Sequence, residues 1–264
     1  MNIKPYPLKR GQWFEEATPK KYVVWHGTAG RTRDTPSFGR PGRATTSSDG
    51  WNLDALRVGA PYLVDRDGTI YKTFDDAGWI YHLGIKGTNG RYDKSSVAIE
   101  FANELGLALD GDRLHAFGMN TPNTVYTGAY FACDWRDFHY YAQMDEEQVD
   151  VGIELILDIC RRHEIEPSFY YPSTTFDFPR CFQVATIVCH SNCRKDKTDL
   201  CLPEWVYEKV EGAGIRLVSS GAAAAAHPSR PPQESRRSSR SLPDRENDVS
   251  YVHHGHVDLR ARNF

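Results

Sequence analysis

The chain has 264 residues, of which 40% are hydrophobic and 25% are charged. This balance is normal for a globular protein with enough apolar side chains to bury a core. No stretch approaches the roughly 18 consecutive apolar residues of a membrane helix, so the sequence excludes an integral membrane protein. The formal net charge of −3 gives no electrostatic reason to expect a nucleic acid or an anionic membrane as a partner.

Cysteine usage and the N-terminus bear on the cellular compartment. Six cysteines are too few for a disulfide scaffold in a chain of this length. The N-terminal residues MNIKPYPLKRGQW include basic side chains but no apolar stretch behind them, unlike a secretory signal. We therefore expect synthesis in the cytoplasm, which leaves open action elsewhere after release or non-classical export.

The sequence divides into an N-terminal extension (1–19), a folded domain (20–217) and a tail (218–264). The tail is rich in Ser, Pro, Arg and Ala and has no apolar periodicity, so we expect it to be disordered. Two insertions interrupt the domain: residues 30–58 are rich in Gly, Arg, Ser and Thr, and residues 104–143 in aromatic side chains. Long loops of this kind often border a binding site, although packed decoration is an equal interpretation.

Short apolar runs predict the strands of the domain. They lie at 20–26, 60–74, 95–103 and 183–190. The run at 60–74 surrounds Asp67-Gly68, which predicts a hairpin with a type I′ turn, because that turn needs φ > 0.

Helical periodicity follows over 145–165. Its apolar residues fall on one helical face: Val149, Ile153, Ile156, Leu157 and Cys160. Asp145 with Gln148 resembles a capping box that starts this helix, and Pro203 predicts the first turn of a second helix at 203–210. Mixed strands and helices indicate an α/β (α+β) domain, with a single mixed β-sheet flanked by helices.

Candidate metal ligands stand at strand ends. His26 ends the first predicted strand, His190 ends a late one, and Asp199 follows nine residues on. Two imidazoles and a carboxylate can hold Zn²⁺ and leave a fourth position for water, as in catalytic sites. A single histidine is more often a structural residue, and spacing alone does not decide between the two interpretations.

A cysteine-based site is a second metal hypothesis. Cys189, Cys193 and Cys201 lie near His190 and resemble the ligand set of a structural zinc site. However, adjacent residues of a strand point to opposite faces, so Cys189 and His190 cannot easily bind one ion. Buried free thiols are the better interpretation.

Five segments occur in an order typical of one family. They are VVWHGTAG (23–30), PYLVDRDGTIYKTF (61–74), WIYHLG (79–84), SVAIEFAN (96–103) and CHSNCRKDKTD (189–199). Over about residues 20–210 the chain resembles the zinc-dependent N-acetylmuramoyl-L-alanine amidases (amidase type 2), relatives of phage lytic amidases and peptidoglycan-recognition proteins. The resemblance implies that family's fold and one catalytic Zn²⁺. It also implies a peptidoglycan or muropeptide substrate, cleaved at the amide between the lactyl group of N-acetylmuramic acid and L-Ala.

The resemblance also assigns roles to residues. The family's metal ligands correspond to His26, His190 and Asp199. Glu100 matches the general base of some members, and Ala60 stands where others have a catalytic tyrosine. Lys197 matches the basic residue that holds the oxyanion, and His82 matches a histidine near the substrate. Plainer interpretations exist for Glu100, a strand residue facing solvent, and for Lys197, part of a solvated charged loop.

The chain departs from the family pattern at three places. Leu200-Cys201 follow Asp199, where the family has Pro-Gly, and Tyr81-His82-Leu83-Gly84 stand where the family has Trp-His-Ala-Gly. The insertion at 104–143 is longer than in a minimal member. These changes leave the local turn and the details of substrate contact open.

We predict a zinc-dependent peptidoglycan amidase with no nucleic-acid partner and no obligate protein partner. The alternative is a recognition module that binds muropeptide without cutting it; such relatives lose a zinc ligand, whereas this chain keeps all three. A third hypothesis is a scaffold whose tail recruits a partner. The sequence does not decide among a phage lysin, a recycling enzyme and a delivered effector, nor does it give the stem-peptide preference or the oligomeric state.

Overall fold

The computed structural model of the chain describes residues 1–29, 57–116 and 125–221. These residues belong to one compact unit, residues 1–225. No helix among them is long and apolar enough to cross a membrane. The predicted insertion at 30–58 lies outside the described residues except for its last two positions, and the predicted tail does so from residue 222 onward.

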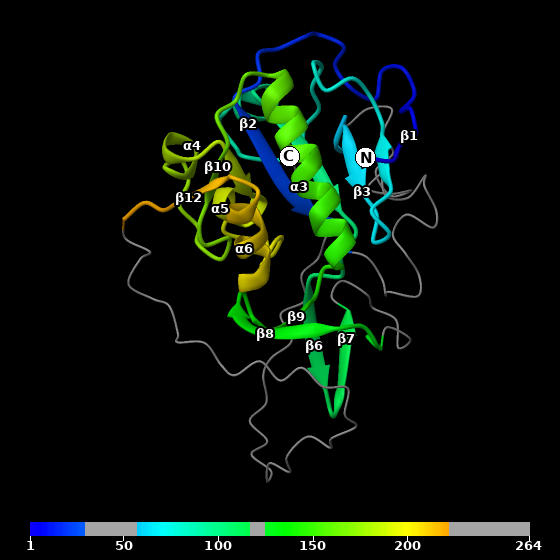
Figure 1. Ribbon diagram of the computed structural model, residues 1–264, viewed down its shortest axis with the longest axis vertical. Helices are drawn as coiled ribbons and strands as arrows, with labels where there is room; N and C mark the ends of the chain where they lie inside the picture. Colours follow the sequence, from blue (N-terminus) through cyan, green and yellow to red (C-terminus); the bar gives the residue numbers. More distant parts are fainter. Residues whose placement is uncertain (30–56, 117–124, 222–264) are drawn as a thin grey trace. The chain divides into compact units, whose positions relative to one another are not determined.

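A central sheet of eight strands organises the described part of the chain (Figure 1). Its strand order is β1 (Ile3–Pro5), β4 (Ile70–Lys72), β3 (Tyr62–Val64), β5 (Ser96–Phe101), β2 (Tyr22–Gly27), β11 (Ile187–Cys189), β10 (Ser168–Tyr170) and β12 (Arg216–Val218). All neighbouring strands are parallel except β3 and β4, which form an antiparallel hairpin. The predicted mixed sheet is confirmed.

Helices cover both faces of this sheet. The helices are α2 (Arg91–Lys94), α3 (Glu146–Arg162), α4 (Cys181–Val184), α5 (His190–Cys193) and α6 (Glu204–Gly212). α3 and α6 pack on the face that buries Val23 and Trp25, whereas α4 packs on the face that buries Val24. Because side chains alternate along a strand, His26 lies on the face opposite α3.

The hairpin at 60–74 is confirmed, but its turn differs from the prediction. Gly68 has a φ of +74°, whereas Asp67 has no positive φ. The Gly68 N–H donates to the Asp65 carbonyl oxygen at 3.1 Å. This is a type I turn followed by a left-handed glycine, the usual three-residue hairpin loop, rather than a type I′ turn.

The helix predicted at 145–165 is α3, but it does not begin with a capping box. The Asp145 side chain caps no backbone N–H. Gln148 is fully buried, and its Nε2 donates to the carbonyl oxygens of Val64 at 3.0 Å and Ala102 at 3.1 Å. The Gln148 side chain therefore satisfies buried carbonyl oxygens at the ends of β3 and β5. Buried carbonyls need a protein donor, whereas water can satisfy an exposed helix terminus.

The late elements differ from their predicted bounds: the strand is shorter, whereas the helix predicted at 203–210 is α6, Glu204–Gly212. Within 183–190 only residues 187–189 form a strand, since α4 occupies the residues before it and His190 already opens α5. Pro203 takes the N-cap position of α6 rather than its first turn.

A second sheet corrects the prediction of a single sheet. The insertion at 104–143 folds largely into four antiparallel strands in the order β7 (Arg113–Ala116), β6 (Gly106–Asp110), β9 (Phe138–Ala142) and β8 (Tyr130–Trp135). In β8 exposed and half-buried residues alternate, as expected for a strand with one packed face. We call these four strands the inserted sheet. In Figure 1 it lies beyond the C-terminal end of β2 and the N-terminal end of α3.

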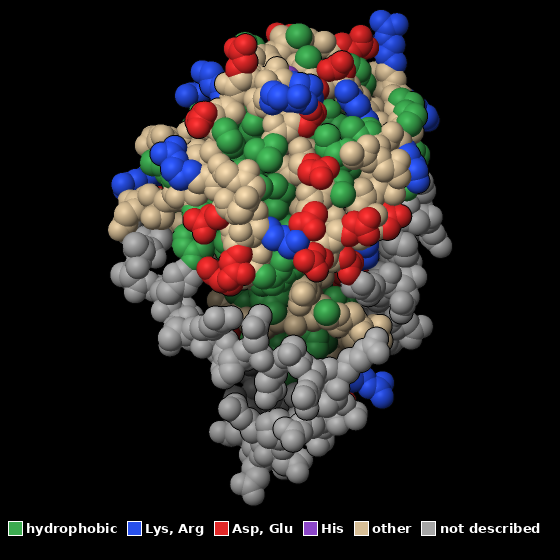
Figure 2. Space-filling view, in the orientation of Figure 1, with side chains coloured by type: hydrophobic (Ala, Val, Ile, Leu, Met, Phe, Trp, Pro, Cys, Tyr) green, Lys and Arg blue, Asp and Glu red, His purple; other side chains and the backbone are tan. Residues whose placement is uncertain are grey.

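The outer face of α3 and α6 is acidic. Figure 2 shows red side chains gathered over these two helices, with few basic ones between them. Lys209 of α6 joins the helices, because its Nζ contacts Glu146 at 3.0 Å and Asp150 at 2.6 Å. Exposed pairs of this kind contribute at most about 1 kcal/mol each.

Candidate metal centre

The parallel pairing of β2 with β5 places the first functional side chains. His26 is the register partner of Glu100, and both side chains lie on the sheet face opposite α3. His26 is 2% exposed. The edge where parallel strands end is the usual place for a site in an open α/β sheet.

The second and third candidate ligands lie in the segment that follows β11. His190 is the first residue of α5, and the backbone N–H of Ser191 donates to the Asp199 carbonyl oxygen at 2.7 Å. This bond returns the loop after α5 to the helix start, and the chain then leaves Asp199 through a cis peptide bond to Leu200. The bond from Ser191 keeps Asp199 beside His190, although Leu200-Cys201 stand where the family has Pro-Gly.

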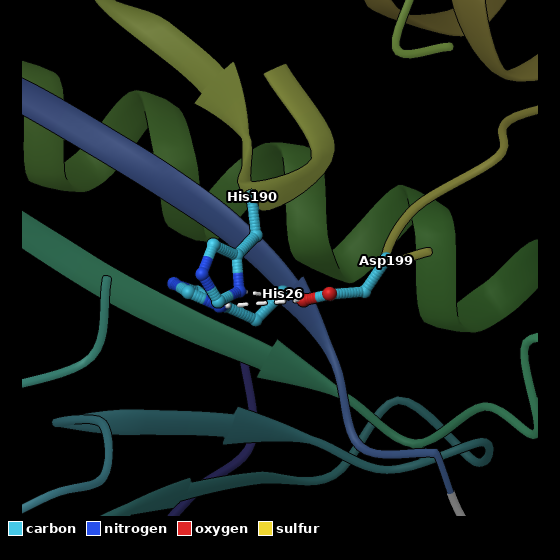
Figure 3. A group of neighbouring side chains, drawn as sticks. All are labelled: His26, His190 and Asp199. Atoms are coloured by element: carbon cyan, nitrogen blue, oxygen red, sulfur yellow. Dashed lines mark hydrogen bonds and ion pairs between the residues drawn. The ribbon is translucent and has the colours of Figure 1, made fainter. Parts of the chain in front are cut away.

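Figure 3 shows His26, His190 and Asp199 reaching toward one another from β2, from the start of α5 and from the loop beyond it. His26 Nδ1 lies 3.0 Å from His190 Nδ1, and Asp199 Oδ2 lies 3.4 Å from His26 Nδ1 and 3.1 Å from His190 Nδ1. All three side chains are buried, with ligand atoms within 4.8 Å of one another. In the described part of the chain this is the one group of at least three His, Cys, Asp or Glu residues that can hold a metal ion.

The hydrogen bonds of His190 fix its tautomer. Its Nε2 lies 3.0 Å from the Leu83 carbonyl oxygen, which can only accept, so Nε2 carries the proton. Burial lowers the pKa of His190, so the ring is neutral at pH 7. Nδ1 therefore presents a lone pair to Asp199.

A chain of three hydrogen bonds fixes the tautomer of His26 in the same way. The Ser96 hydroxyl donates to the Tyr92 carbonyl oxygen at 2.6 Å and accepts from His82 Nε2 at 2.8 Å. His82 is neutral because burial lowers its pKa to about 3, so its Nδ1 accepts from His26 Nε2 at 3.0 Å. His26, whose pKa burial lowers to about 4, is then left with a bare Nδ1.

The donor set suits a divalent cation. Two bare imidazole nitrogens and one carboxylate oxygen face one another without a proton between them. A cation among the three groups would favour the ionised form of the Asp199 carboxyl, because a nearby opposite charge favours the charged form. Buried acceptors at 3.0–3.4 Å repel one another unless a cation lies among them, and N₂O sets of this kind bind Zn²⁺.

Glu100 is the buried carboxyl beside this cluster. Burial, and then the charge of Asp199, raise its pKa to about 8, against an opposing effect of Lys197. Its Oε2 is buried without a hydrogen-bond partner among the described residues. A carboxyl with a raised pKa and a free oxygen can exchange protons near neutral pH.

The structure brings the predicted site residues together to different degrees. The three ligand candidates meet, Glu100 lies beside them, and Lys197 is close enough for its charge to affect Glu100 and His26. His82 contacts His26, and its contact with the substrate stays a prediction. Sequence reasoning missed Ser96 and the Leu83 carbonyl, and no sequence signal identifies a backbone oxygen as a partner.

The cysteine-based zinc hypothesis has no support in the described residues. Cys189 and Cys193 are buried in different hydrophobic clusters. All six cysteines are free thiols.

Comparison with known proteins decides the family. A family model described as N-acetylmuramoyl-L-alanine amidase matches residues 16–201, well over half of the chain. The chain belongs to this amidase family. No curated protein sequence matches this amidase.

Solved structures similar to this amidase are remote in sequence. A mutant endolysin from Bacillus subtilis is 15% identical, with 81% of this chain and 96% of that chain covered and a TM-score of 0.42. The Ph2119 endolysin of a Thermus scotoductus bacteriophage is 17% identical, with 81% and 100% covered and a TM-score of 0.40. The N-acetylmuramyl-L-alanine amidase AmiD from E. coli, in complex with an anhydro-N-acetylmuramic acid peptide, is 19% identical, with 76% and 60% covered and a TM-score of 0.43.

Proposed function

We propose that this amidase is a zinc enzyme that cleaves the amide between the lactyl group of N-acetylmuramic acid and L-Ala of the peptidoglycan stem. The observation that carries the proposal is the juxtaposition of two bare imidazole nitrogens and a carboxylate in one buried spot. Family membership supplies the substrate class.

His26, His190 and Asp199 would hold the ion through Nδ1, Nδ1 and Oδ2. When bound there, Zn²⁺ supplies Lewis acidity, which lowers the pKa of water to about 7 and polarises an amide carbonyl. Three protein ligands leave room for water and substrate, as in catalytic rather than structural zinc sites.

Glu100 is the proton carrier in this proposal. Its carboxylate takes a proton from the attacking water and delivers it to the nitrogen of the leaving L-Ala. General acid–base catalysis of this kind contributes about 10²–10⁴-fold to a rate. The buried Oε2 of Glu100 supports the assignment, because it has no hydrogen-bond partner in residues 1–29, 57–116 and 125–221.

Lys197 and His82 act around the reacting atoms. The Lys197 ammonium offers positive charge to the oxygen of the tetrahedral species, where loss of one donor costs about 3–4 kcal/mol. His82 keeps the His26 ring in the tautomer that frees Nδ1, through the contact between His82 Nδ1 and His26 Nε2. Hydrogen-bonded partners of metal-bound histidines commonly orient them in this way.

The site assignment is tested by measuring zinc content and peptidoglycan hydrolysis of His26→Ala. We expect the variant to purify with little zinc and to lose hydrolysis. His139→Ala is the matched control, since that histidine is 79% exposed and should keep both. A His26→Ala protein that stays zinc-loaded and active would contradict the assignment.

A further inference from the structure

The inserted sheet meets the loop beyond Asp199 at a pair of cysteines. Half-buried residues of β8 alternate on one face of the strand: Phe131, Cys133 and Trp135. This face packs on Cys201, which belongs to the same hydrophobic cluster. Two thiols that are far apart in sequence thus lie together, two residues after Asp199.

Cys133 packs against the buried cluster that contains Cys201. Cys201 is also close enough to lower the pKa of the Cys133 thiol. A shift in strand register at the bulge between Ala132 and Trp135 bends β8 at this point, and bulges commonly re-aim a side chain. Both residues are free thiols.

Non-covalent contacts hold the two segments in this arrangement. Arg136, in the turn after β8, donates from Nη2 to the Arg194 carbonyl oxygen at 3.3 Å. The Tyr141 hydroxyl donates to the Trp135 carbonyl oxygen at 2.7 Å and closes the hairpin. The turn after β8 is therefore attached to the segment that leads from α5 toward Cys201.

We propose that Cys133 and Cys201 are a disulfide site, oxidised by a small disulfide of the glutathione class, which ties the inserted sheet to the loop that carries Asp199. This inference does not depend on the proposed function.

The reaction balances as two thiol–disulfide exchanges. The Cys133 thiolate attacks a sulfur of oxidised glutathione and expels one glutathione thiolate. The Cys201 thiolate then attacks the Cys133 sulfur of the mixed disulfide and expels the second. Two protein thiols lose two electrons and two protons, and one glutathione disulfide becomes two thiols. Cys133 reacts first, because it is half-buried whereas Cys201 is 6% exposed.

A second thiol pair serves as an internal comparison. Cys193 and Cys181 belong to one hydrophobic cluster, but they are only 2% and 0% exposed. A glutathione molecule cannot reach either sulfur in the folded protein, so we expect this pair to stay reduced. Proximity of two thiols is therefore not sufficient for a disulfide, because the oxidant must also reach one of the sulfurs.

The test exposes the full chain to an excess of oxidised glutathione, quenches with acid, alkylates the remaining thiols in denaturant and maps non-reduced peptides by mass spectrometry. We expect one linked pair, Cys133 with Cys201, and alkylation of the other four cysteines. Oxidation should raise the melting temperature by roughly 5–10 °C. Cys133→Ser should abolish both effects, whereas Cys181→Ser, its matched control in the buried pair, should keep both.

Other outcomes would overturn the proposal. Six alkylated cysteines after oxidation would show that the pair does not form, and a Cys181–Cys193 link would show that access does not control oxidation. Loss of the Cys133–Cys201 link in Cys181→Ser would show that this link depends on the buried pair, which the proposal excludes.

Discussion

At the residue scale, two backbone carbonyls determine the chemistry of the metal centre. Leu83 accepts from His190 Nε2, and Tyr92 begins the chain that reaches His26 Nε2 through Ser96 and His82. Because carbonyls only accept, every proton in both chains has one possible position. Both Nδ1 atoms are left bare before any ion binds.

The first residue-scale prediction concerns His82. Replacing it with Ala removes the acceptor for His26 Nε2, so we expect zinc affinity to fall about 10–100-fold, as for other outer partners of metal ligands. His82→Asn keeps an oxygen near the position of Nδ1 and should recover much of this loss. Competition with a chromophoric chelator measures the affinity. Equal losses in the Ala and Asn variants would mean that His82 acts through packing alone.

The second residue-scale prediction concerns Glu100. Glu100→Gln keeps the shape of the side chain but cannot carry a proton, so turnover should fall at least about 100-fold while zinc content stays at the wild-type level. Steady-state hydrolysis and metal analysis of the same preparation measure the two quantities. Near wild-type turnover would assign the base to another group.

At this scale the sequence predicted the ligand candidates but not their surroundings. His26 lies near the end of β2 as predicted, whereas His190 directly follows β11 and opens α5. The contact between His82 and His26 could not be predicted, because it joins two segments far apart in the sequence and depends on tertiary packing.

At the element scale, both ends of α3 are attached to the sheet by buried polar groups. Near its start Gln148 donates to the ends of β3 and β5. At its end Arg162 Nη1 lies 2.8 Å from Asp76 Oδ2, and His163 Nε2 lies 3.3 Å from the same oxygen. Asp76 is 2% exposed. Contacts at both ends therefore fix the position and the direction of α3 relative to the central sheet.

The element-scale prediction concerns the pH dependence of stability. Burial opposes ionisation of Asp76, but Arg162 and His163 lower its pKa below the usual value. A lowered carboxyl pKa stabilises the folded state above the unfolded pKa of about 4, and this contribution is lost as the pH falls through the folded pKa. Asp76→Asn should therefore lower the free energy of unfolding by about 2–3 kcal/mol at pH 7, and the difference from wild type should shrink toward pH 3.

Urea unfolding of wild type and Asp76→Asn at several pH values measures this difference. Any loss of zinc at low pH affects both proteins equally and therefore cancels in the difference. Glu154→Gln is the control on the same helix, because Glu154 is 64% exposed and should leave stability unchanged. A difference that stays constant from pH 7 to pH 3 would mean that the charge of Asp76 contributes nothing.

At the scale of the whole molecule, the parallel strands bring segments from the whole described chain to one edge of the central sheet. His26, Glu100 and His190 come from the first, middle and last thirds of the domain, and the inserted sheet packs on the loop beyond Asp199 through Cys201. The sequence predicted the mixed sheet because its strands are continuous apolar runs. The inserted sheet was missed because aromatic residues of β8 stand at exposed as well as half-buried positions, as Tyr130 and Phe131 do, so no apolar–polar alternation marks the strand within the aromatic-rich insertion.

The central claim is metal-dependent cleavage of one amide in peptidoglycan, and product analysis tests it most directly. Purified peptidoglycan is incubated with the full chain, with and without a zinc chelator, and the products are identified by mass spectrometry. The proposed function predicts released stem peptides that begin with a free L-Ala amine, and their absence when the chelator is present. Intact peptidoglycan with the protein bound to it would contradict the claim and indicate a recognition module.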